Sequence, residues 1–138
     1  MITKIQSFTD LITNSSSTVF VMYEDDANYY DNLEGAESCI WITRIDMGWL
    51  RYNIYEFEMV CNLLDIDPSE ITTRSESKWR DWENPDKETW NTFLDSHKEQ
   101  IEEVFQDLYW VDIEDHFEDA YDVTNDARED AIWYESRH

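Results

Sequence analysis

The sequence predicts an α+β fold: one domain over residues 1–138, with a small, largely antiparallel sheet of about four strands covered by three or four helices. The chain has 138 residues, of which 41% are hydrophobic, so it is long enough to bury a core and too apolar to remain disordered. Short runs rich in β-branched and aromatic residues occur on both sides of a region with helical periodicity. The expected order, β-β-β-α-α-α-β-α, favours helices on one face of the sheet.

Four short segments have the composition of strands. These are residues 2–8, 18–23, 39–46 and 108–115, each rich in β-branched or aromatic side chains. In the last of them Tyr109, Val111 and Ile113 share one face, which we expect to pack against the core. Residues 14–18 are expected to form a loop, whereas residues 24–37, with six carboxylates, are compatible with either a loop or a short helix.

Capping signals mark the first two expected helices. Asn53 is followed three residues later by Glu56, which resembles a capping box and predicts a helix through residue 64. Asp67 stands before Pro68, and Asp suits the N-cap while Pro suits the first helical position. This second helix is expected to continue to Trp82.

Two further helices are expected towards the C-terminus. Asn84 and Pro85 repeat the start signal, and apolar residues then follow a helical stripe from Trp90 to Leu108 over about five turns. The last helix is expected to begin after Thr124, with Asp126 at its positive end, and to end at residues 133–134.

Acidic residues dominate the chain. It has 33 Asp and Glu against 10 Lys and Arg, a net charge of −23, and residues 99–135 hold 14 carboxylates with Arg128 as their one basic residue. Self-repulsion of this size costs stability, so the charge is expected to serve binding. A solubilising surface or adaptation to high salt would also explain it, although 15% aromatic residues fit salt adaptation poorly.

Residue patterns argue against several kinds of chemistry. Gly35 and Gly48 are the two glycines, which excludes a phosphate-binding loop and a dinucleotide fingerprint. No nucleophile elbow surrounds the serines at 15–17, and His97 lies on the apolar stripe, as a core histidine would. Cys39 and Cys61 are expected to be buried thiols. The sequence therefore predicts no enzyme activity, no catalytic residue, no cofactor and no metal.

A metal-dependent enzyme is a less favoured alternative. Asp112, Glu114 and His116 alternate along the last expected strand, so their side chains would share one face and could bind a metal. The spacing of an EF-hand calcium loop is absent.

A resemblance adds to this picture. In size, acidity, aromatic content and lack of a catalytic motif, the chain resembles the phage- and plasmid-encoded DNA-mimic proteins that block restriction enzymes, CRISPR effectors or other DNA-binding host proteins. The run Asp10-Leu-Ile-Thr-Asn-Ser-Ser-Ser-Thr-Val-Phe-Val21 is similar to a segment near the start of uncharacterised phage proteins. The overall resemblance implies that the protein acts by mimicking DNA, and the similar run at residues 10–21 implies a phage origin. Neither resemblance assigns site residues.

Charge density agrees with this mode of action. The 23 net charges correspond to about 40 Å of duplex, and a compact domain of this length is roughly 35 to 40 Å across. We hypothesise an inhibitor that presents carboxylates to the nucleic-acid groove of a basic host protein. The expected binding residues are Glu99, Glu102, Glu103, Asp107, Asp112, Glu114, Asp115, Glu118, Asp119, Asp122, Asp126, Glu129 and Asp130.

The second alternative is a protein–protein adaptor or subunit anchored by exposed aromatic side chains. The candidate anchors are Trp79, Trp82, Trp110, Trp133 and Tyr134. A homodimer is compatible with every alternative, whereas direct nucleic-acid binding is not expected because phosphates would be repelled. The N-terminus lacks the pattern of a secretory signal and no segment has the length of a membrane span, so we expect a cytoplasmic protein.

Overall fold

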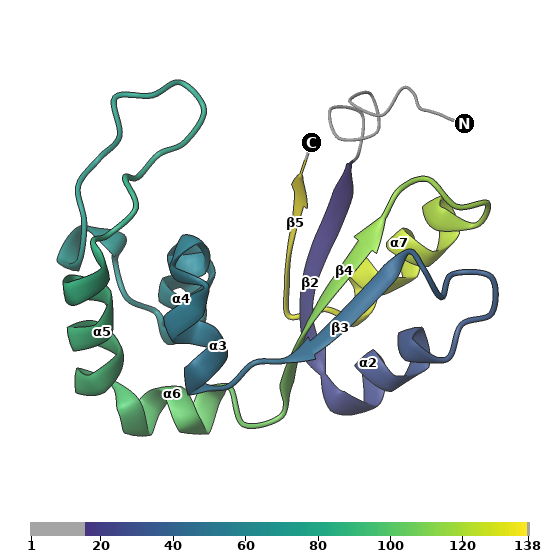
Figure 1. Ribbon diagram of the computed structural model, residues 1–138, viewed down its shortest axis with the longest axis horizontal. Helices are drawn as coiled ribbons and strands as arrows, with labels where there is room; N and C mark the ends of the chain where they lie inside the picture. Colours follow the sequence, from purple (N-terminus) through teal and green to yellow (C-terminus); the bar gives the residue numbers. More distant parts are fainter. Residues whose placement is uncertain (1–15, 138) are drawn as a thin grey trace. The chain divides into compact units, whose positions relative to one another are not determined.

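The computed structural model describes residues 16–137 and confirms the α+β class, with a four-stranded antiparallel sheet and six α-helices in that range (Figure 1). The expected strand at 2–8 and residues 14 and 15 of the expected loop lie outside the described residues. The chain divides into two compact units. The sheet unit comprises the described residues up to 43 and those from 108 onwards, and the helical unit comprises residues 44–107. One domain over 1–138 therefore stays a prediction.

The sheet has the order β3-β4-β2-β5, and its strands are β2 (Ser17–Tyr23), β3 (Ile40–Arg44), β4 (Leu108–Glu114) and β5 (Trp133–Arg137). The central strand β2 pairs antiparallel with β4 and β5, so that Phe20 lies opposite Val111 and Tyr134. Residues 18–22 are all buried, as expected of a central strand with packing on both faces. The predicted strands at 18–23, 39–46 and 108–115 are confirmed, with β3 shorter than expected.

Helices α2 (Glu24–Asp31) and α7 (Ala120–Asp130) cover one face of this sheet (Figure 1). The core between them contains Phe20, Met22, Val111, Ile113, Ala27, Tyr30 and Ala127, all nearly or fully buried. Alternation along β4 places Val111 and Ile113 on this face, as predicted. Residues 24–31, which the sequence left undecided between loop and helix, are helical.

On the opposite face, two tryptophans cover the centre of the sheet. Val21 pairs with Trp110 on one side and with Trp133 on the other. The two indole rings stack with centroids 6.1 Å apart, and Val21 is fully buried. Because strands β4 and β5 flank β2, the rings must lean towards each other over the valine.

The helical unit contains α3 (Met47–Tyr52), α4 (Phe57–Leu64), α5 (Lys87–Ser96) and α6 (Lys98–Val104), with single 3-10 turns at Ile54–Glu56 and Pro68–Glu70. Trp90 on α5 is fully buried, and its indole Nε1–H donates to the carbonyl of Leu50 on α3 over 2.8 Å. Its ring also stacks on Phe93 with centroids 5.4 Å apart. A large aromatic side chain thus joins two helices of this unit.

The predicted start of the first helix was wrong. Asn53 ends α3, a helix that the sequence did not predict, and its side-chain amide donates to the Trp49 carbonyl over 2.8 Å. The N-cap of α3 is Asp46, whose carboxylate accepts from the Trp49 N–H over 2.8 Å. The sequence predicts a strand over residues 39–46, whereas Asp46 lies beyond β3 and caps the next helix.

The expected helix from Asp67 to Trp82 was also wrong. Asp67 caps as predicted, accepting from the Ser69 N–H over 2.9 Å, but regular structure ends after the single turn Pro68–Glu70. The following residues include two threonines and two serines without an apolar stripe, so nothing sustains a helix there. Arg74 instead forms a bridge with Trp82 and lies 4.3 Å from its ring centroid.

The long C-terminal stripe is divided between two helices. Asp86 rather than Asn84 is the N-cap of α5, and His97 separates α5 from α6. The His97 ring lies 4.4 Å from that of Phe93, and its Nδ1 is 2.9 Å from the Phe93 carbonyl. His97 packs half-buried within this unit, and α6 ends at Val104 rather than Leu108.

The end of the chain differs most from the prediction. Helix α7 begins at Ala120 and ends at Asp130, so Asp126 lies in its middle rather than at its positive end. Residues 133–137 form the edge strand β5 instead of a helix end. Trp133, Tyr134 and Arg137 are compatible with a strand, but pairing with β2 is long-range and gave no local signal.

Candidate acidic binding surface

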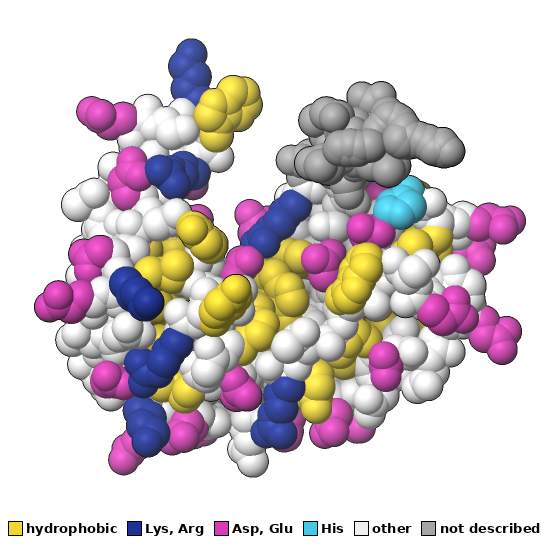
Figure 2. Space-filling view, in the orientation of Figure 1, with side chains coloured by type: hydrophobic (Ala, Val, Ile, Leu, Met, Phe, Trp, Pro, Cys, Tyr) yellow, Lys and Arg dark blue, Asp and Glu magenta, His cyan; other side chains and the backbone are white. Residues whose placement is uncertain are grey.

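Helices α2 and α7 carry a dense group of carboxylates, which we call the α2–α7 acidic surface. Its members lie on these two helices or at the N-cap of α7, and all of them are exposed except Asp26, which is half-buried. They are Glu24, Asp25, Asp26, Asp31, Asp119, Asp122, Asp126, Glu129 and Asp130. Figure 2 shows acidic side chains over the loops at the right-hand end of the sheet unit, where no Lys or Arg side chain is seen in that view.

A buried tyrosine links the two helices. The Tyr30 hydroxyl on α2 donates to a carboxylate oxygen of Asp130 on α7 over 2.7 Å. Burial, this hydrogen bond and the charges of Asp130 and Asp126 raise the pKa of Tyr30 well above its ordinary value. The hydroxyl therefore stays protonated and donates across the whole physiological pH range, which fixes the C-terminal part of α7 against α2.

The charge of the sheet unit is strongly unbalanced. Its described residues include 16 Asp and Glu against two basic residues, Arg128 and Arg137, a net charge of −14. Arg128 donates to the Asn125 side chain over 2.9 Å and lies 5.8 Å from the Tyr134 ring centroid. Arg137 lies 3.1 Å from Glu135 and 5.4 Å from the Trp110 ring centroid. Both cations thus interact with groups outside the α2–α7 acidic surface.

The linear density of carboxylates along each helix is close to the density of phosphates along one DNA strand. Asp119 to Asp130 hold five carboxylates over about 18 Å of axis, or one carboxylate per roughly 3.6 Å, and Arg128 in the same stretch lowers its net charge to −4. Helix α2 holds four over about 12 Å, or one per roughly 3 Å. A strand of duplex DNA carries one charge per about 3.4 Å of axis.

The thirteen predicted acidic residues fall into three groups. Glu99, Glu102, Glu103 and Asp107 are exposed on or just after α6 and belong to the helical unit. Asp112 and Glu114 are half-buried on β4, on the same face as Trp110, and Asp115 and Glu118 are exposed between β4 and α7. The structure brings the remaining five together on α7 and its N-cap: Asp119, Asp122, Asp126, Glu129 and Asp130.

Sequence reasoning missed the α2 carboxylates as part of this surface. The signal was present, because residues 24–37 contain six carboxylates, but the segment was not assigned to a helix. The pairing of β2 with β4, which places α2 and α7 over the same face, has no signature in local sequence.

The five candidate aromatic anchors are divided between the helical unit and the two faces of the sheet. Trp79, 93% exposed, and the half-buried Trp82 belong to the helical unit. Trp110 and Trp133 stack on one face of the sheet, whereas Tyr134 packs against Phe20 on the other, with ring centroids 6.1 Å apart. Within the sheet unit, the structure therefore brings Trp110 and Trp133 together and places Tyr134 on the other face.

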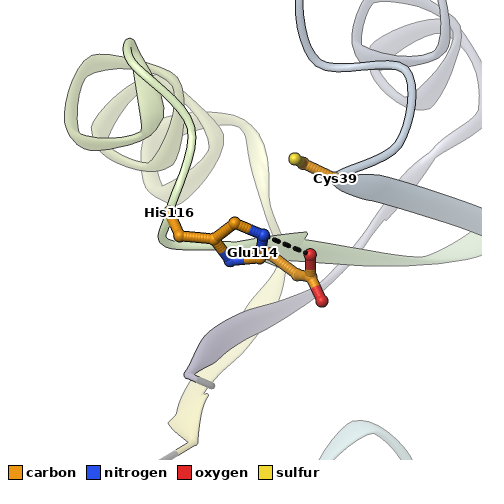
Figure 3. A group of neighbouring side chains, drawn as sticks. All are labelled: Cys39, Glu114 and His116. Carbon is orange, nitrogen blue, oxygen red and sulfur yellow. Dashed lines mark ion pairs between the residues drawn. The ribbon is translucent and has the colours of Figure 1, made fainter. Parts of the chain in front are cut away.

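A group of potential metal ligands lies at one end of the sheet (Figure 3). Cys39, Glu114 and His116 each offer one donor atom, and these atoms lie within 4.8 Å of one another. The sequence suggests Asp112, Glu114 and His116 as possible metal ligands. The structure brings Glu114 and His116 together, but the third residue of the group is Cys39 and not Asp112. Cys39 is buried and unbonded to Cys61, as predicted for both thiols.

No protein-family model, curated protein or solved structure matches the chain.

Among residues 16–137, no helix has the length and apolar character needed to cross a membrane.

Proposed function

We propose that this protein is a nucleic-acid-mimicking inhibitor that binds the DNA- or RNA-binding groove of a basic host protein. The observation that carries the proposal is the α2–α7 acidic surface, with nine carboxylates on two packed helices. Their spacing along each helix approaches that of phosphate charges on a DNA strand. A groove lined with Lys and Arg would meet a comparable charge density on this surface.

Two of the nine carboxylates are placed where they favour a role in binding rather than in folding. Asp31 lies at the C-terminal end of α2, and Glu129 lies at that of α7. Carboxylates there oppose the helix dipole, and like charges on neighbouring helical positions repel one another. Asp31 and Glu129 therefore weaken the helices, so a benefit outside the fold accounts for them better.

The proposal includes a target and a mode of association. Such a target is a nucleic-acid-handling or defence protein of a bacterial host, met in the cytoplasm if the gene is phage-borne. Release of the counterions held by both partners drives association, and the field of the sheet unit speeds the encounter.

Neutralising the α7 charges tests this proposal. In Asp122→Asn/Asp126→Asn/Glu129→Gln, three exposed carboxylates are removed while the Tyr30–Asp130 hydrogen bond is kept. The matched control, Glu99→Gln/Glu102→Gln/Glu103→Gln on α6, removes the same charge from the helical unit. Tagged variants are compared in capture from a bacterial lysate, and duplex DNA is then used to release the bound proteins.

We expect the α7 variant to lose on the order of tenfold or more of the DNA-releasable nucleic-acid-binding protein that the wild type captures. The α6 variant should retain most of it. Equal losses in both variants would contradict a defined surface on α2 and α7, and capture insensitive to both would contradict a charge-based mode altogether.

The aromatic alternative receives less support from the structure. The Trp110 and Trp133 rings stack on each other beside the buried Val21, so they already have a packing role. Capture that survives both high salt and DNA would favour this adaptor function.

A further inference from the structure

We propose that Cys39, Glu114 and His116 form a binding site for Zn²⁺ at the end of the sheet where β3 begins and β4 ends. The site is separate from the α2–α7 acidic surface, and it does not depend on the proposed inhibitory function. It arises from the pairing of two strands that are distant in the sequence (Figure 3).

Backbone pairing fixes the first two ligands. The Glu114 N–H donates to the Cys39 carbonyl over 2.9 Å, which holds the two residues side by side. His116 follows two positions after Glu114, and its Nε2 lies 3.1 Å from Glu114 Oε2. All three donor atoms lie within 4.8 Å of one another.

These distances are close to those of a tetrahedral zinc site. Zn–N and Zn–O bonds of about 2.0 to 2.2 Å put neighbouring N and O ligands about 3.3 Å apart, and a Zn–S bond of about 2.3 Å puts sulfur about 3.5 Å from them. The observed His116–Glu114 separation of 3.1 Å already matches such an edge. The three donor atoms lie up to 4.8 Å apart, so the Cys39 sulfur and the other two ligands would need to approach each other by about 1 Å. Rotation of the exposed His116 and half-buried Glu114 side chains can close this gap.

The mixture of donors selects the kind of metal. Thiolate, imidazole and carboxylate together suit Zn²⁺, whereas Ca²⁺ and Mg²⁺ take oxygen ligands. The Cys39 side chain is 8% exposed, which protects its thiolate from solvent once the metal is bound. The net negative charge of the sheet unit concentrates cations around it.

Binding would exchange protons for metal. The imidazole must be neutral and the thiol deprotonated to act as ligands, so protons compete with Zn²⁺ and its affinity falls as the pH is lowered. Three protein ligands leave the fourth tetrahedral position to water or to another ligand. The bound ion would join the residue before β3 to the segment that leads from β4 into α7.

The test is a metal titration of the full chain, reduced and freed of metal by a chelator. Calorimetry with ZnCl₂ gives affinity and stoichiometry, and Co²⁺ serves as a spectroscopic probe. We expect one ion per chain with micromolar or tighter affinity, a thiolate-to-cobalt charge-transfer band, and a rise in Tm on the order of 5 °C with saturating Zn²⁺.

His116→Gln carries the test because the side chain is exposed and its removal should not unfold the protein. It should weaken Zn²⁺ binding on the order of 100-fold and abolish the Zn²⁺-dependent rise in Tm. Cys39→Ser should remove the charge-transfer band, whereas the controls Cys61→Ala and Glu118→Gln should retain it.

Two results would overturn the site. Affinity no tighter than the millimolar range in the wild-type chain would show that the three side chains do not form a metal centre. Binding that His116→Gln leaves unchanged would show that Zn²⁺ is held by the acidic surface in general.

Discussion

The hydroxyl group of Tyr30 holds the Asp130 carboxylate of α7 in place. Its hydrogen bond to Asp130 joins α2 to α7 within a part-buried environment, and hydrogen bonds to charged groups stabilise more than neutral ones. Tyr30→Phe should therefore lower the free energy of unfolding by about 1 to 2 kcal/mol, as measured by urea denaturation. Tyr29→Phe is the matched control, because its neighbouring ring is 58% exposed. Equal effects of the two substitutions would remove the proposed link between the helices.

Asp86 gives the helical unit an acid-sensitive cap. Its carboxylate accepts from the Thr89 N–H over 2.8 Å and from the Thr89 hydroxyl over 3.0 Å. These hydrogen bonds lower the pKa of Asp86 below its ordinary value of 3.8. Because the folded-state pKa is depressed, the stabilisation is complete above the unfolded-state value and is lost as the pH falls through the folded-state pKa.

The Asp86 cap should therefore stabilise the helical unit only while its carboxylate is ionised. Asp86→Ala should lower Tm by a few degrees at neutral pH, and the difference from wild type should shrink as the pH falls below 3.8. Thermal unfolding followed by circular dichroism over a pH series measures it. A difference that stays constant down to about pH 2 would contradict a role for the ionised cap.

At the scale of elements, α5 depends on Trp90. Its side chain is fully buried and bonded to the Leu50 carbonyl of α3. Trp90→Phe leaves that carbonyl unsatisfied and a small cavity beside it, so we expect a loss of about 2 to 4 kcal/mol in urea unfolding. The matched change Trp79→Phe affects a ring that is 93% exposed and should alter stability by less than about 0.5 kcal/mol. Similar losses would show that Trp90 does not anchor α5.

Local signals predicted some elements well. The alternation in β4 and the β-branched composition of β2 identified the two strands that pair at the centre of the sheet. The Asp67–Pro68 signal located a real cap, but a cap without a following apolar stripe produced a single turn. The stripe from residue 90 onwards predicted helical structure without revealing the break at His97.

Long-range pairing set the limit of prediction. Residues 133–137 form a strand because they pair with β2, and no pattern within those five residues indicates that partner. The same applies to the candidate sites. The acidity of α7 was evident from composition, whereas the approach of Cys39 to Glu114 depends on how β3 adds to β4.

At the scale of the whole molecule, the net charge of −23 predicts that salt stabilises the fold. Added salt screens repulsion among exposed carboxylates beyond the Debye length of about 10 Å at 0.1 M. Tm should rise as NaCl increases from about 0.02 M to about 0.5 M, as measured by differential scanning fluorimetry. A Tm that stays constant or falls over this range would mean that self-repulsion contributes little to stability.

The most direct test of the proposed function is whether duplex DNA and this protein compete for the same partner. The wild-type chain is immobilised, a bacterial lysate is applied, and bound proteins are eluted with a salt series or with duplex DNA at constant ionic strength. We expect to recover a nucleic-acid-binding protein whose retention falls steeply with salt and which duplex DNA displaces. Retention unchanged by both salt and DNA would contradict nucleic-acid mimicry.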